Sequence, residues 1–367
     1  MKIPYRKFSP LKTIDFVKIG LGDNLMAWAG LYALLKYGYS VCAPDCTMYV
    51  PKAIAPLASE IFREWDLQVE GASFNDAVEY RSPVLTPQAP TTVQQFKSVY
   101  MGNDWWLNWA EAIDRVKTGS YYHQKPMSFR QKVRLQVSET ILHGRIDWRS
   151  AYPDYIGSRI WSPIARRHDI PQAKFLVMLK NTLEPLRQHV RAYAGNVQFT
   201  QKAECIVFPA GKSYQTLPPF FCRQIKDSVP DTALTYILPL GDAWMEKYVA
   251  QGLEIGALES VDEILASVLQ TKVIVTADSF VSHVAQFLRD DFLLILSRDF
   301  RENVVHPGAY PRIVAKHPDC ALCEYHSREF HEKCPAGSPH CIAFDESAVL
   351  DGCIDELRTL LARNTQR

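Results

Sequence analysis

The chain has 367 residues, of which 47% are hydrophobic and 22% charged, and its formal net charge is +1. This length exceeds what a single core usually holds, so two domains are expected. The near-neutral charge argues against a dedicated nucleic-acid-binding protein, and the ordinary composition argues against long disordered tracts. The apolar runs are shorter than a signal peptide or a membrane helix requires, which predicts a cytoplasmic protein.

The first predicted strand covers residues 16–19 and runs into a glycine turn at residues 20–24, which a helix follows. The turn lacks the third glycine of a dinucleotide-binding fingerprint, so it does not predict that kind of site. It does place the carboxylate of Asp23 at the start of a helix, where the helix dipole favours the charged form and therefore a base. A simple helix-capping role for Asp23 explains the same pattern equally well.

Residues 40–43 and 67–69 are predicted as further short strands, separated by helix-like stretches at 56–65 and 103–116. This alternation is typical of a parallel sheet with crossover helices. From residue 117 to residue 167, basic residues far outnumber acidic ones, which predicts a surface directed at an anionic partner. The basic residues of interest there are Arg130, Lys132 and Arg134.

The strand pattern restarts in the second half, with predicted strands at residues 205–208, 234–238, 273–275 and 292–296. The turn after the first of these contains Gly211, Lys212 and Ser213, which combine a glycine, a cation and a hydroxyl. In open α/β sheets, ligands bind outside the carboxyl ends of the strands, so this turn is a candidate diphosphate loop. An ordinary surface loop remains the alternative.

The third of these strands leads into a second turn with polar side chains, Asp278, Ser279, Ser282 and His283. Asp278 and Ser279 can exchange hydrogen bonds with sugar hydroxyls, and the other two side chains lie one turn into the following helix. A capping box is not expected, because the residue three places after Ser279 is Ser282, neither Glu nor Gln. The alternative is a capped helix with His283 packed inside.

Four of the nine cysteines gather near the C-terminus, at Cys320, Cys323, Cys334 and Cys341. Four thiolates can complete a tetrahedral site for zinc or iron, and such a closed site is structural and takes no part in chemistry. Three histidines nearby, His326, His331 and His340, are alternative ligands. We favour a metal site over four unrelated free thiols, because four cysteines seldom fall within so short a stretch of sequence by chance.

Together these motifs resemble the ADP-heptose:lipopolysaccharide heptosyltransferases, glycosyltransferase family 9. The resemblance rests on the Gly-Asp turn at 20–24, the loop at 208–213 and the Asp-Ser-x-x-Ser-His element at 278–283. The cysteine segment is similar to the iron-binding finger of the autotransporter heptosyltransferases, a branch that modifies protein acceptors. Between about residue 69 and residue 196 the chain carries no motif that matches the family.

The resemblance implies an α/β architecture of the GT-B type, in which two Rossmann-like domains face each other across a central cleft. The N-terminal acceptor domain would span residues 1–190. The donor-binding domain would span residues 191–345 and include the cysteine finger at 317–342, and a C-terminal helix would occupy residues 346–367.

The resemblance also implies roles for individual residues. Asp23 matches the catalytic base, and no metal is expected in the chemistry. The acceptor side comprises Gly22, Asn24, Arg130, Lys132 and Arg134. The donor side comprises Gly211, Lys212, Ser213, Asp262, Asp278, Ser279, Ser282 and His283. The chain departs from the family after the phosphate loop, where a lysine is replaced in Gln215-Thr216-Leu217-Pro218, so Lys212 is left as the phosphate cation.

The implied activity is an inverting transfer of heptose from ADP-heptose to a hydroxyl of a lipopolysaccharide core or of a protein. One alternative keeps the fold and changes the donor to a UDP or GDP hexose. Another is a non-catalytic protein of the same fold that uses the cysteine finger for assembly. The expected partners are a nucleotide sugar and an anionic glycolipid or protein acceptor, with peripheral membrane contact and homo-oligomerisation left open.

Overall fold

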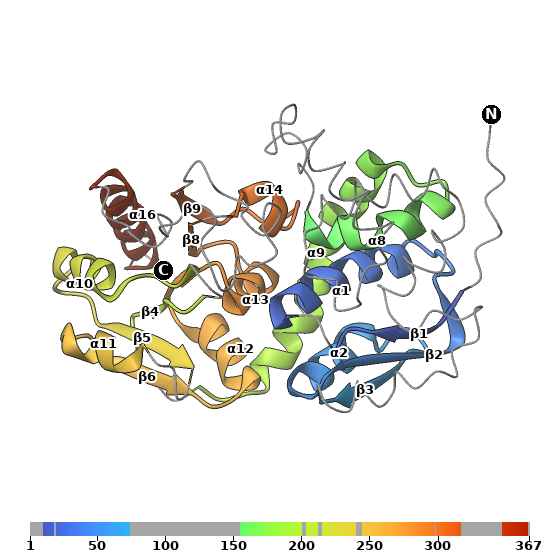
Figure 1. Ribbon diagram of the computed structural model, residues 1–367, viewed down its shortest axis with the longest axis horizontal. Helices are drawn as coiled ribbons and strands as arrows, with labels where there is room; N and C mark the ends of the chain where they lie inside the picture. Colours follow the sequence, from blue (N-terminus) through green and yellow to red (C-terminus); the bar gives the residue numbers. More distant parts are fainter. Residues whose placement is uncertain are drawn as a thin grey trace, which may run out of the picture.

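The computed structural model describes residues 10–17, 20–73, 155–199, 203–211, 215–239, 244–297, 299–316 and 347–365. Within these ranges the chain is α/β and contains two separate parallel sheets, one in each half of the sequence (Figure 1). This confirms the predicted fold class of two parallel α/β units. None of the helices in the described ranges is long and apolar enough to cross a membrane.

The first sheet has the strand order β1-β2-β3. Its elements are β1 (Leu11–Asp15), α1 (Leu21–Lys36), β2 (Cys42–Pro51), the short helix η1 (Lys52–Ile54), α2 (Ala55–Phe62) and β3 (Gln68–Ala72). The prediction of a first strand at residues 16–19 is wrong for Phe16 and Val17, because β1 ends at Asp15, and residues 18 and 19 lie outside the described residues. Phe16 still donates its backbone N–H to Tyr49 over 2.8 Å and is buried, so its apolar character reflects packing just beyond the strand.

The second sheet has six strands in the order β6-β5-β4-β7-β8-β9, all parallel. They are β4 (Cys205–Phe208), β5 (Leu234–Pro239), β6 (Ile255–Leu258), β7 (Val273–Ala277), β8 (Leu293–Leu296) and β9 (Arg312–Ala315). The four central strands confirm the predicted series. The sequence misses β6 and β9, since both lie at the sheet edges, are only partly buried and therefore lack the continuous apolar run of a central strand.

The helices of this second unit are α10 (Pro219–Ser228), α11 (Met245–Ala250), α12 (Val261–Gln270), α13 (Phe280–Leu288), α14 (Arg301–Val304) and α16 (Ser347–Thr365). The C-terminal helix α16 packs against α10 and against β7, β8 and β9. Its buried face contributes Val349, Cys353, Leu357 and Leu360 to the core of that unit. The last helix of the chain therefore belongs structurally to the second unit.

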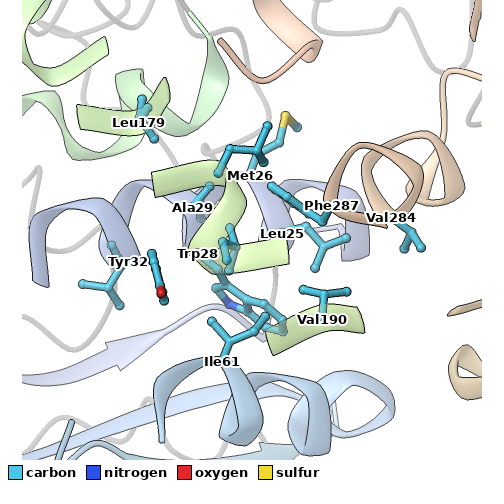
Figure 2. Close-up of a cluster of buried hydrophobic side chains, with 14 of the residues drawn as sticks. Leu25, Met26, Trp28, Ala29, Tyr32, Ile61, Leu179, Val190, Val284 and Phe287 are labelled. Atoms are coloured by element: carbon cyan, nitrogen blue, oxygen red, sulfur yellow. The ribbon is translucent and has the colours of Figure 1, made fainter. Parts of the chain in front are cut away.

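Two helices connect the units, α8 (Ile156–Arg167) and α9 (Gln172–Gly195). The long helix α9 contacts α1 and α2 of the first unit and α12 and α13 of the second (Figure 1). One buried apolar cluster runs through all of these helices. Figure 2 shows its centre, where Trp28 of α1, Ile61 of α2 and Val190 of α9 lie close to Val284 and Phe287 of α13. The two units therefore share a continuous core at their junction.

Arginines of α9 fix the carboxyl end of α13. The guanidinium group of Arg187 donates to both carboxylate oxygens of Asp290, over 2.9 and 2.6 Å, and its Nε donates to the carbonyl of Gln286 over 2.9 Å. Arg191 donates from Nε to the carbonyl of Leu288 over 2.8 Å. Burial alone would raise the pKa of Asp290, but Arg187 outweighs that effect and lowers it. These contacts hold the last carbonyls of a helix, which lack partners within the helix itself.

Candidate active site

The two polar turns singled out in the sequence lie at the starts of α1 and α13, and these helix starts are in contact. A Cβ atom added at Gly22 of α1 would lie 2.5 Å from Cδ2 of His283 and 3.5 Å from Cα of Phe280, both in α13. Only a glycine allows α1 to approach this closely. The fold therefore brings the Asp23 turn and the Asp278 turn to the same junction between the two units (Figure 1).

Asp23 is the third residue of α1 and is partly exposed. Asp23 is not the N-cap residue of α1, because Gly20, three places earlier, occupies the cap position. The carboxylate turns back toward the helix start, since a Cβ atom added at Gly20 would lie 3.1 Å from Oδ2 of Asp23. The positive end of the helix dipole favours the ionised form of a carboxylate placed there.

Asn24, the next residue, stabilises the turn from inside. It is fully buried, and its Nδ2 donates to the carbonyls of Phe16 and Gly20, over 3.2 and 3.1 Å. Both hydrogens of this amide nitrogen are thus directed at the backbone segment that leads into α1. Asn24 has a structural role in this turn, and its predicted contact with an acceptor stays a prediction.

Three neighbouring strands of the second sheet, β4, β7 and β8, end in a cluster of buried polar side chains. Gln215 follows β4, Asp278 follows β7 and Asp299 follows β8, and each is less than 8% exposed. The Nε2 atom of Gln215 donates to Oδ2 of Asp278 over 2.8 Å and to Oδ2 of Asp299 over 2.6 Å. An amide nitrogen carries two hydrogens, so this bridge uses both.

The start of α13 is organised by Ser282. Its Oγ accepts a hydrogen bond from the backbone N–H of Ser279 over 3.2 Å and donates to the carbonyl of Ser279 over 2.7 Å. Ser282 thus makes the bond that Glu or Gln makes in a capping box, and the expectation that no such box forms is wrong. A serine can replace Glu or Gln in this bond because serine side chains readily hydrogen-bond to nearby backbone groups.

His283 is packed inside the protein, in agreement with the alternative prediction of a capped helix with a buried histidine. It is 6% exposed, and its Nε2 lies 3.9 Å from Oδ1 of Asp278. Burial lowers the pKa of His283 to about 4, against an opposing effect of the Asp299 charge. The imidazole is therefore neutral near pH 7, and the predicted donor-binding role of His283 would be that of a neutral hydrogen-bonding group.

The loop after β4 closes on itself at its base. Leu217 donates its backbone N–H to the carbonyl of Pro209 over 2.9 Å, and the hydroxyl of Thr216 donates to the carbonyl of Gly211 over 2.9 Å. A Cβ atom added at Gly211 would lie 2.6 Å from Cβ of Gln215, so this position requires glycine. Lys212 and Ser213, which follow Gly211 in the sequence, lie outside the described residues.

Asp262 lies in the first turn of α12, which follows edge strand β6 at the same carboxyl edge of the sheet. Its Oδ1 accepts a hydrogen bond from the hydroxyl of Tyr193 in α9 over 2.8 Å. Burial, reinforced by Asp262, raises the pKa of Tyr193 to about 12. The carboxylate predicted to bind the donor ribose thus contacts the helix that links the two units.

Several predicted site residues lie outside the described ranges: Arg130, Lys132, Arg134, Cys320, Cys323, Cys334 and Cys341. Inside those ranges, no group of three or more His, Cys, Asp or Glu side chains is placed to hold a metal ion. The sequence reasoning misses Asp299 and gives Gln215 no role in binding. The signal available for Asp299 is the one used for Asp278, namely an acid just beyond the carboxyl end of a buried strand.

No protein-family model matches the chain, and no curated protein sequence matches it. Among solved structures, it is similar to E. coli ADP-heptose lipopolysaccharide heptosyltransferase II, with 14% identity, a TM-score of 0.49, and coverage of 97% of this chain and 100% of that one. It is also similar to the iron-containing dodecameric glycosyltransferase TibC of enterotoxigenic E. coli, with 13% identity, a TM-score of 0.49, and coverage of 96% and 78%. For a family 9 glycosyl transferase from Veillonella parvula, the values are 10% identity, a TM-score of 0.47, and coverage of 96% and 97%.

Proposed function

We propose that this protein is an inverting glycosyltransferase that uses a nucleotide-sugar donor. The observation that carries the proposal is the contact between the starts of α1 and α13, where Gly22 lies against His283. Gly22 directly precedes the partly exposed Asp23, and His283 lies in the helix that begins just after Asp278 and Ser279. A transferase of this kind needs a base on the acceptor side and polar groups on the sugar side within one site.

In the proposed reaction, Asp23 takes the proton of an acceptor hydroxyl while the hydroxyl oxygen attacks the anomeric carbon of the donor sugar. The new glycosidic bond forms as the bond to the nucleotide diphosphate breaks, and the diphosphate leaves with the electron pair. A positioned base of this kind contributes about 10²–10⁴-fold to the rate. The position of Asp23 in the first turn of α1 suits this role, because the positive end of a helix dipole favours a negatively charged side chain.

The departing diphosphate gains negative charge, and the loop after β4 is where we place its stabilisation. Gly211 allows the tight base of that loop, and the next two residues in the sequence, Lys212 and Ser213, would supply a cation and a hydroxyl donor. Preorganised donors at a developing charge usually make the largest single contribution to catalysis. We assign the transferred sugar to the Asp278 turn and the donor ribose to Asp262.

The donor we propose first is ADP-heptose, and UDP or GDP hexoses are the alternatives. The acceptor side would include the basic residues Arg130, Lys132 and Arg134, which suit an anionic glycolipid or an acidic protein surface. The four thiols Cys320, Cys323, Cys334 and Cys341 form a donor set that suits structural zinc or iron. A metal analysis of anaerobically purified protein tests this part separately, and protein without zinc or iron would rule it out.

The test of the function is turnover. Purified protein is incubated with ADP-, UDP- and GDP-sugars, with and without acceptor extracts, and release of the nucleotide diphosphate is measured. We expect one donor class to be consumed and Asp23→Asn to lower that rate by about 10²-fold or more at unchanged melting temperature. Asp169→Asn, at an exposed turn before α9, is the matched control. Absence of turnover with every donor, or full activity of Asp23→Asn, would refute the proposal.

A further inference from the structure

The Gln215 bridge between Asp278 and Asp299 has no role in the reaction outlined above. Its three members come from separate strand ends, and Asp278 belongs to the central one, since β7 lies between β4 and β8 in the sheet. Gln215 thus reaches across the end of β7 to a carboxylate on the far side. Hydrogen bonds from a neutral donor to carboxylates are short and strong, and the observed 2.8 and 2.6 Å fit that class.

Gln215 also belongs to the loop proposed to bind the donor diphosphate. It lies directly against Gly211, and its neighbour Thr216 hydrogen-bonds to Gly211 through both the backbone N–H and the carbonyl of that glycine. The base of the loop is closed by Thr216 and by the backbone of Leu217, and the Gln215 side chain extends from this closed base toward the turn after β7. On the other side, Oδ1 of Asp278 faces Ser282 at 3.5 Å, and Ser282 organises the start of α13.

We propose that Gln215 and Asp299 are positioning residues that hold the loop after β4 and the turn after β7 at a fixed position relative to each other. The inference rests on the proposed function, in which the loop binds the diphosphate and the turn binds the sugar. Gln215 connects the two segments through its hydrogen bond to Asp278, and Asp299 orients the Gln215 amide by accepting its second N–H.

The relative position of the loop and the turn matters only to a ligand that contacts both segments at once. An intact nucleotide sugar spans the loop and the turn, whereas a nucleotide diphosphate alone contacts the loop and leaves the turn empty. Removal of the hydrogen bonds of Gln215 should therefore misalign the sugar of an intact donor, while the affinity for the diphosphate alone stays nearly unchanged. Misalignment of about 1 Å between reacting groups is enough to lower a rate by about 10²-fold.

The experiment compares Gln215→Ala, Asp299→Ala, the double variant and Asp299→Asn, with Asp227→Ala on the surface of α10 as the control. Two quantities are measured for each: kcat/KM for the donor that the wild type consumes, and the Kd of the matching nucleotide diphosphate by calorimetry. We expect kcat/KM to fall about tenfold or more in both alanine variants, and Kd to change less than about threefold. Asp299→Asn keeps an acceptor oxygen for Gln215 and should retain most of the activity.

Because Asp299 is proposed to act through Gln215, the double variant should be no worse than Gln215→Ala alone. If an alanine variant does not fold, Gln215→Asn carries the test, since it keeps the amide but withdraws it by one methylene group. Equal losses in kcat/KM and diphosphate affinity, or additive losses in the double variant, would overturn the inference, as would full activity of every variant. A wild type that consumes no nucleotide sugar would instead refute the proposed function, and the inference with it.

Discussion

The contact between Gly22 and His283 gives the sharpest prediction about the junction of the two units. In Gly22→Ala, the new methyl group would lie 2.5 Å from Cδ2 and 3.2 Å from Nε2 of His283. Ordinary carbon contacts are about 3.5–4.0 Å, so α1 and α13 must separate by roughly 1 Å, or the buried ring must move. Overpacking of this kind costs about 1–3 kcal/mol, whereas Ala in place of a helical Gly gains up to about 1 kcal/mol.

We therefore expect Gly22→Ala to lower the free energy of unfolding by about 1–2 kcal/mol net. The same separation moves Asp23 away from the Asp278 turn, and we expect the transfer rate to fall by about 10²-fold. Urea unfolding measures the first quantity and nucleotide diphosphate release measures the second. Gly195→Ala at the end of α9 is the matched control, because no atom lies within 4 Å of the added methyl group.

A double-mutant cycle isolates the cause. In a His283→Ala background, the nearest remaining neighbour of the new methyl group is Cα of Phe280, at an ordinary contact distance of 3.5 Å. Gly22→Ala should then become neutral or stabilising, so the sign of its effect depends on the ring. If Gly22→Ala destabilises the two backgrounds equally, or leaves the wild type unaffected, the helix contact described above does not exist in solution.

Two further predictions concern the same junction. Arg187→Ala removes the donor to Asp290 and to the end of α13. It should lower the free energy of unfolding, measured with urea at pH 7, by about 2–4 kcal/mol, a range reduced because the Asp290 carboxylate is half-exposed. The exposed ion pair between Arg223 and Asp227 is the control, and its removal should change the free energy of unfolding little. A second buried histidine, His306, lies just after α14. Burial lowers the pKa of His283 to about 4 and of His306 to about 3, below the 6.5 of the unfolded chain, so the stability that both neutral side chains contribute is full above pH 6.5 and is lost on acidification. His283 alone accounts for roughly 3 kcal/mol of that loss by pH 4. A flat stability profile from pH 7 to pH 4, or one that His306→Phe does not flatten, would contradict this.

Local pattern was a sound guide wherever a segment is buried on all sides. The central strands of the second sheet are continuous apolar runs, such as Val273–Ala277, and they were identified because burial on both faces leaves no room for polar residues. The edge strands Ile255–Leu258 and Arg312–Ala315 were missed, since one side of each is open and their composition is mixed. The apolar pattern predicts the first strand a few residues too late, because Phe16 and Val17 are buried beyond the end of β1.

The sequence by itself determined the two α/β series, the two polar turns and the presence of Asp23 and Asp278 at helix starts, because strand-to-helix turns follow from local apolar spacing and small residues. Only the tertiary structure decided that Gly22 lies against His283 and that Gln215 joins Asp278 to Asp299. Those pairs are separated by 63 residues or more along the chain. They meet because a parallel sheet gathers the ends of non-consecutive strands at one edge, and because α9 packs both units into one core, neither of which has a local signature.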